Sequence, residues 1–214
     1  MSRGPKKKLT RPLYSVSSDN TRERILNAAL ALIKQRGDAN VTMADIAKAT
    51  KISRQAVYLH FTDRADLMVA LVRYADEKRG LATEIQKIAD APNGAAALRE
   101  MAALQARMNP TIWAAARAVD AVRRTDPAAE RSWQDRLQHR LDGARQVIAR
   151  LQTDGNLRPG LDSKSAADLL WTITSLRTWE DLVLQRGWTA VQYKELITKL
   201  LLQTLTGDHN GGNL

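Results

Sequence analysis

Residues 41–67 carry the sequence VTMADIAKATKISRQAVYLHFTDRADL, which indicates two short helices joined by a tight turn. Thr42 is a good N-cap, because its hydroxyl can accept a hydrogen bond from the first turn of a helix. Ser53 is an equally good N-cap for a helix that runs to about His60. Only Thr50 to Ile52 separate the two helices. This joint predicts a helix-turn-helix, whose second helix enters the major groove of DNA.

The flanking sequence is helical as well. A first helix is expected from about Thr21 to Arg36, ended by Gly37, and a helix from Asp63 to about Arg79 leads onward. Pro and Gly separate later stretches with apolar spacing of three and four, and strand-like alternation is missing. Later helices are expected at about 95–108, 110–124, 128–154, 163–185 and 189–206.

The fold class predicted is therefore all-α, with an N-terminal three-helix helix-turn-helix DNA-binding domain and a larger C-terminal helical domain. The boundaries expected are a flexible basic arm over 1–20, the helix-turn-helix domain over 21–67, the helical domain over 68–206 and a disordered tail over 207–214.

The third helix carries residue types suited to DNA. Arg54 and Gln55 lie in its first turn, and Arg can pair bidentately with guanine and Gln with adenine. Ser53 leaves backbone N–H groups facing an anion at the helix start, and Tyr58 and His60 can donate to phosphates. Alone, Tyr58 and His60 are more often core residues, and Arg54 and Gln55 could be ordinary solvated residues. Their joint placement on one short helix favours the DNA roles.

The same stretch resembles the DNA-binding domain of the TetR (tetracycline repressor) family over Thr21 to Leu67. The resemblance rests on a Thr-capped helix with Ile46-Ala47 and a Ser-led helix that ends in Tyr-x-His-Phe. It implies that one set of residues reads bases and that a second set contacts the DNA backbone: Arg54, Gln55 and Ala56 for the bases; Thr42, Tyr58, His60 and Arg64 for the backbone, where Ser53 joins them through the N–H groups at the start of its helix. Lys51 stands where the family usually has Gly, and a left-handed backbone there would cost Lys about 1–2 kcal/mol.

The charge is concentrated towards the N-terminus. The chain has 33 Lys and Arg against 23 Asp and Glu, a formal net charge of +10, and residues 1–66 hold 13 of the former and 6 of the latter. A basic head on a near-neutral body is expected of a nucleic-acid-binding protein. The arm could insert into an adjacent minor groove or track phosphates, or it could act only as a solubility tail. Its basic residues are Arg3, Lys6, Lys7, Lys8 and Arg11.

Large aromatic and thioether side chains in the C-terminal region suggest a cavity. Trp113 lies among alanines, and small side chains near a large aromatic could line a pocket. The candidate lining is Met101, Met108, Trp113, Trp171 and Trp179, although each residue alone is more often a core residue. The family resemblance implies a bound small-molecule effector there.

The helix from Ser163 is apolar on two faces and the last helix is similarly rich in leucine. A helix that is apolar on two sides must bury both, and one side could meet a partner chain. The resemblance implies a four-helix interface in a homodimer, for which Leu182, Leu196 and Leu200 are the candidates. The alternative is an ordinary bundle core in a monomer.

Several functions are disfavoured. The chain has no Cys, which rules out disulfides, a Cys-ligated zinc site and a cysteine nucleophile. Its three His have no metal-ligand spacing, and neither a nucleophile elbow nor a phosphate-binding glycine loop is present, so neither an enzyme nor a metal or other cofactor is expected. No apolar run approaches the roughly 18 residues of a membrane span, and the basic N-terminus lacks the apolar stretch of a secretory signal, which favours a cytoplasmic protein.

The sequence thus predicts a homodimeric transcriptional regulator, most often a repressor in the TetR family, that binds a double-stranded DNA operator. A small molecule bound in the C-terminal domain would release it. The alternative is a DNA-binding architectural or protein-docking factor of the same fold that has no effector.

Overall fold

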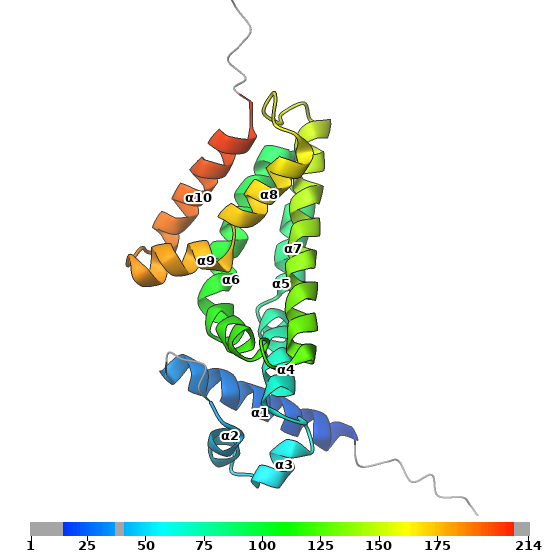
Figure 1. Ribbon diagram of the computed structural model, residues 1–214, viewed down its shortest axis with the longest axis vertical. Coiled ribbons are helices and arrows are strands. Elements are labelled where there is room, and N and C mark those ends of the chain that lie inside the picture. The colour runs from blue at the N-terminus through cyan, green and yellow to red at the C-terminus, as the bar shows by residue number, and fades with distance from the viewer. Residues whose placement is uncertain (1–14, 37–40, 208–214) are drawn as a thin grey trace, which may run out of the picture.

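The computed structural model describes residues 15–36 and 41–207, and within them it is built from helices without a strand. Figure 1 shows a small head formed by α1, α2 and α3 at one end and a larger helical body at the other. The all-α prediction is confirmed. The elements are α1 (Ser15–Arg36), α2 (Met43–Thr50), α3 (Arg54–Tyr58), α4 (Arg64–Lys78), α5 (Leu81–Ala89), α6 (Gly94–Val122), α7 (Pro127–Thr153), α8 (Ser163–Ile173), α9 (Leu176–Trp179), the π-helix η1 (Glu180–Gln185) and α10 (Ala190–Leu205).

The head has its own hydrophobic core, which continues past Leu67 into α4 as far as Tyr74. Val57 and Phe61, on and just after α3, are almost fully buried in it, as their spacing predicts. The core also takes in residues of α6 and α7, namely Ala115, Ala118, Val119 and Ala129. The head is therefore packed directly against the body by α4 and the C-terminal half of α6.

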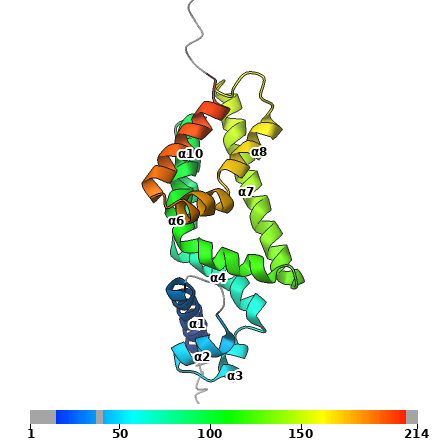
Figure 2. The same cartoon turned by 60° about the vertical axis from the view of Figure 1, so that its left-hand side comes forward.

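The helix α6 is one continuous element where the sequence predicts two segments, 95–108 and 110–124. Pro110 lies inside it, and the buried Asn109 precedes the proline. Proline lacks a backbone N–H and its ring clashes with the preceding turn, so it bends a helix when packing holds both halves in place. Figure 2 shows the bend, with the first half of α6 running along the body and the second half crossing above the head.

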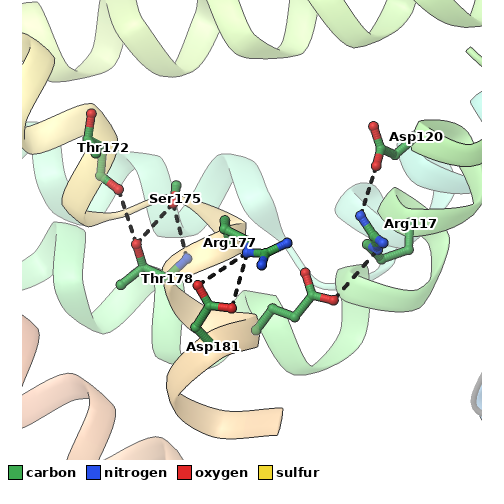
Figure 3. Close-up of polar contacts among 8 residues, drawn as sticks. Arg117, Asp120, Thr172, Ser175, Arg177, Thr178 and Asp181 are labelled. Atoms are coloured by element: carbon green, nitrogen blue, oxygen red, sulfur yellow. Dashed lines mark hydrogen bonds and ion pairs between the residues drawn. The ribbon is translucent and has the colours of Figure 1, made fainter. Parts of the chain in front are cut away.

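The predicted helix 163–185 is broken after Ile173 into α8, α9 and η1. Ser175 caps α9 by accepting from the Thr178 N–H at 3.1 Å, and the Thr178 hydroxyl donates to the Thr172 carbonyl oxygen at 3.2 Å (Figure 3). Short hydroxyl side chains compete with helical backbone hydrogen bonds in this way. The chain therefore turns here although its apolar spacing is helical throughout.

Three further features differ from the prediction. The helix α1 begins at Ser15, so part of the stretch expected to be a flexible arm is helical. The segment Leu81–Ala89 forms α5, a helix that the sequence pattern does not predict. Gly207, expected in the tail, donates its N–H to the Asn156 carbonyl oxygen at 3.1 Å.

One end of the body depends on a close approach between α6 and α7. A Cβ atom on Gly94 would lie 2.7 Å from the backbone nitrogen of Leu151, and the Gly94 N–H donates to Asp154 Oδ2 at 2.6 Å. Only glycine lets two backbones come this near. Across the described ranges, no helix is both long and apolar enough to cross a membrane.

Candidate nucleic-acid interface

The turn between α2 and α3 is a Schellman motif with a lysine at its left-handed position. Lys51 has φ 56° and ψ 37°, the Ile52 N–H donates to the Ala47 carbonyl oxygen at 3.1 Å, and the Lys51 N–H donates to the Lys48 carbonyl oxygen at 3.3 Å. Glycine is the usual residue here because it has no Cβ. Among the residues that the structure describes, Lys51 alone has a positive φ without being glycine.

Replacing Lys51 with glycine is expected to raise the free energy of unfolding by about 0.5–1 kcal/mol, because relief of the left-handed strain exceeds the added entropy of the unfolded chain. Urea unfolding followed by circular dichroism measures the change. Lys51→Ala is the matched control, since it removes the charge and keeps the Cβ. A glycine variant no more stable than the alanine variant would show that the turn carries no such strain.

The helix α3 presents its polar side chains to solvent. The Ser53 side-chain oxygen accepts from the Ala56 N–H at 3.0 Å, which confirms the predicted N-cap. Arg54 and Gln55 are exposed in the first turn and Ala56 is half-buried. Tyr58 is 40% exposed, so it is not a core residue. The Arg54 guanidinium lies 5.6 Å from the centre of the Tyr58 ring and donates to its hydroxyl at 3.3 Å, so both side chains project from the same side of α3.

Two of the candidate phosphate ligands are already engaged within the head. The Thr42 hydroxyl donates to Asp45 Oδ2 at 2.8 Å and accepts from the Asp45 N–H at 3.1 Å, in a capping box that confirms the predicted N-cap. Hydrogen bonds from Arg36, then from Thr42, hold the pKa of Asp45 well below its usual range. The Arg64 Nε donates to the Val41 carbonyl oxygen at 3.1 Å. The Arg36–Asp45 pair ties α2 to α1, and the hydrogen bond from Arg64 ties the start of α4 to the residue that precedes Thr42.

The end of α3 adds a residue that the sequence pattern does not single out. Leu59 is 81% exposed, the most exposed large apolar side chain of the described residues, while His60 beside it is half-buried. The signal that could have identified Leu59 is its position: it is a leucine that does not share the side of the short helix on which Val57 is buried. Apolar side chains can contact the thymine methyl group in the major groove. The candidate arm residues Arg3, Lys6, Lys7, Lys8 and Arg11 lie outside the described residues.

The candidate pocket residues lie within the body. Met101, Met108 and Trp179 are buried in its core, and Trp113 and Trp171 pack against that core while partly exposed. None of the five lines the open groove of about 700 Å³ on the surface between α6 and α10. That groove is lined by charged and polar residues, among them Arg99, Arg107, Lys194, Thr198 and Lys199.

The candidate dimer residues differ in exposure. Leu196 and Leu200 on α10 are 36% and 39% exposed, whereas Leu182 on η1 packs partly buried against the body core. Leu169 on α8 is 38% exposed, and α8 and α10 are in contact. Exposed leucines therefore occur on both of these neighbouring helices.

Comparison with known proteins adds to this geometry. Residues 25–71 match a family model described as bacterial regulatory proteins, tetR family. The HTH-type transcriptional regulator AcrR of Shigella flexneri is 35% identical over 63 residues, which is 29% of this chain and 29% of AcrR. TtgR of Pseudomonas putida is 40% identical over 55 residues, 26% of each chain. The matched part thus spans less than a third of these relatives.

Solved structures resemble the whole chain more closely in fold than in sequence. A transcriptional regulator from Saccharomonospora viridis in complex with choline superposes with a TM-score of 0.75 at 19% identity, covering 88% of this chain and 98% of that one. FadR from Bacillus subtilis, in complex with stearoyl-CoA, has a TM-score of 0.67 at 17% identity and covers 85% and 98%. At such identities the likeness shows the fold: an N-terminal helix-turn-helix followed by a helical C-terminal domain.

Proposed function

Because residues 25–71 form a DNA-binding domain of the tetR family of bacterial regulatory proteins, we propose that the whole chain is a homodimeric transcriptional repressor. Its operator affinity is lowered by a small molecule bound in the body. The observation that carries the DNA-binding role is the outward face of α3, where Arg54, Gln55 and Tyr58 are exposed while Val57 is fully buried. A short helix anchored by one face and polar on the other can enter a major groove.

Arg54, Gln55 and Ala56 read base edges, since they lie in the first turn of α3, the part of a recognition helix that contacts bases. Tyr58, His60 and Ser53 contact the backbone. Thr42 and Arg64 reach phosphate only by exchanging or sharing the contacts that they make within the head. Their larger contribution is to hold α2 and α4 in the docking geometry.

Two copies associate through α8 and α10, whose exposed leucines Leu169, Leu196 and Leu200 support this interface. A single recognition helix reads one half-site, and a two-fold dimer matches a symmetric operator. Leu182 lies closer to the body core and contributes at the edge.

The helix α4 couples body and head. The Tyr74 hydroxyl donates to Glu23 of α1 at 3.0 Å, and Arg136 of α7 pairs with Asp76 at 2.5 Å. A displacement of α7 or α6 is thus transmitted through α4 to α1. In one arrangement of the body, the two heads of the dimer no longer match successive major grooves. An effector that binds this arrangement more tightly than the DNA-bound one lowers the affinity for DNA. The loss of DNA affinity equals the ratio of the effector's affinities for the two arrangements. The choline and stearoyl-CoA complexes of similar folds support an effector site in this body.

The test is fluorescence-anisotropy binding to the DNA upstream of the protein's own gene and to scrambled DNA of equal length as salt is raised. We expect the upstream DNA to bind at least about 1,000-fold more tightly, as specific sites do. Equal affinity for both DNAs with one common salt slope would mean that the basic charge alone drives binding, and it would count against the proposal. An upstream complex that no small molecule releases would favour the effector-independent factor.

A further inference from the structure

Among the residues that the structure describes, six buried side-chain polar atoms have no hydrogen-bond partner, and four of them can all act as hydrogen-bond donors in the interior of the body. Four such atoms belong to buried or half-buried residues of α6, α9 and α10: Asn109 Nδ2, Trp113 Nε1, Trp179 Nε1 and Tyr193 Oη. Three of these atoms can only donate a hydrogen bond, and the fourth is a hydroxyl. Asn109, Trp179 and Tyr193 are at most 2% exposed. An unpaired buried donor costs about 1–3 kcal/mol, so a set of four calls for an explanation.

The four groups come from helices that meet. The Trp179 and Tyr193 rings pack edge to face with centroids 5.0 Å apart. Asn109, Trp113 and Arg117 recur every four residues and so share one side of α6. Arg117 Nε lies 3.7 Å from Glu180 Oε1, in the residue after Trp179, so this side of α6 faces α9. Figure 3 shows Arg117 and its pair with Asp120 beside the α8–α9 segment.

A half-buried positive charge lies near Tyr193, one of these donors, and the half-buried carboxylate of Glu180, next to Trp179, is paired with Arg117. Arg140 of α7 stacks 5.3 Å from the centre of the Trp171 ring and donates to the carbonyl oxygens of Trp171 and Thr174 at 3.0 and 3.1 Å. Burial, then the charge of Arg136, lowers the pKa of Arg140 to about 10, and the charge of Arg140 is also felt at Tyr193. Among the residues that the structure describes, the buried set contains no Asp or Glu. A molecule that fits here must supply hydrogen-bond acceptors.

We propose that the body interior between α6, α9 and α10 binds the carboxylate of an apolar carboxylic acid. Trp113, Trp179, Asn109 and Tyr193 donate to its oxygens, and its hydrocarbon part lies against the neighbouring core residues Met108 and Ile112. The π-helix that begins directly after Trp179 supports this placement, because such widened turns are rare and occur often at functional sites. The inference rests on the proposed function in one respect, that this body is an effector-binding unit.

The test uses the full chain without DNA and three probes that each carry a ten-carbon chain: decanoate and decyltrimethylammonium below their micelle concentrations, and 1-decanol below its solubility limit. Calorimetry and the emission of the tryptophans report binding. We expect decanoate to bind at least 10-fold more tightly than either other probe, because only a carboxylate offers charge-assisted acceptors to several donors. A cationic probe that binds as well as decanoate would overturn the proposal, since it would indicate an aromatic cage for cations.

Tyr193→Phe separates binding from folding. Loss of the hydroxyl removes an unsatisfied buried group, so the free variant is expected to melt at the same temperature as wild type or higher. Its affinity for decanoate is expected to fall about 10-fold, the loss of a hydrogen bond to a charged group. Thr198→Val is the matched control, because Thr198 Oγ1 is also buried without a partner but lies at the groove lined by Lys194 and Lys199. It should keep wild-type affinity.

Equal decanoate affinity in wild type and Tyr193→Phe, or no binding to either, would overturn the carboxylate site and indicate that water satisfies these donors. The operator assay is scored separately. Tyr193-dependent decanoate binding without DNA release would uphold the site and contradict the effector part of the proposed function. Failure to prefer upstream DNA in the absence of any probe would contradict the repressor role and leave the probe result unaffected.

Discussion

The Arg54→Ala variant is expected to lose most of its preference for operator over scrambled DNA, by a factor of about 5–150, since a bidentate base contact contributes about 1–3 kcal/mol of discrimination. Arg54 is exposed in the first turn of α3, and its only described contacts are with Tyr58. Removing its side chain therefore leaves the packing of the head intact. The affinity of the variant for scrambled DNA should change little, because that affinity depends on the number of phosphates that the whole protein neutralises. Anisotropy titrations on both DNAs give the ratio.

Arg177→Ala is the matched control for this prediction. It removes the same charge from an exposed position on α9, where Arg177 pairs with Asp181 one turn away and with no other described residue (Figure 3). Its operator preference should equal that of wild type. If Arg54→Ala and Arg177→Ala reduce binding to both DNAs alike, Arg54 contributes net charge rather than base reading.

Replacing Leu196 and Leu200 together with aspartate is expected to convert the dimer into monomers and to lower operator affinity by 100-fold or more. The two leucines are exposed on α10, so the substitutions leave the buried side of that helix, with Tyr193 and Ile197, unchanged. Four carboxylates brought together in the paired interface would be costly to bury. Sedimentation equilibrium gives the oligomeric state, and anisotropy gives the affinity for the full operator.

Ile85→Asp controls for the general effect of an acidic residue at an exposed apolar position. Ile85 lies on α5, which packs against α4 and α6, and is 52% exposed. This variant should remain dimeric and bind the operator as wild type does. Circular dichroism would establish that the double variant is folded. A folded double variant that is still a dimer would place the interface elsewhere.

Local signals in the sequence were sufficient for α2 and α3. The hydroxyls of Thr42 and Ser53 cap α2 and α3 as expected, and Val57 and Phe61 are buried at the predicted spacing. These outcomes depend on a few neighbouring residues. The all-α class follows equally from spacing along the whole chain.

Features that depend on tertiary packing could not be predicted in this way. Pro110 is typical of a helix end, yet contacts on both sides hold α6 together through a bend. Ser175 and Thr178 interrupt a stretch whose apolar spacing is continuous. The partners of Arg64 and Arg140 are carbonyl oxygens distant in sequence, which no local pattern reveals.

The central claim is that a dimer of this chain reads a specific DNA sequence through α3. Selection of bound fragments from a random double-stranded DNA library, followed by sequencing, tests it whatever the operator sequence is. We predict enrichment of one two-fold symmetric motif whose half-sites lie a whole number of helical turns apart, about 10 base pairs per turn. A bound pool with no enriched motif would contradict the claim, since binding would then depend on charge alone.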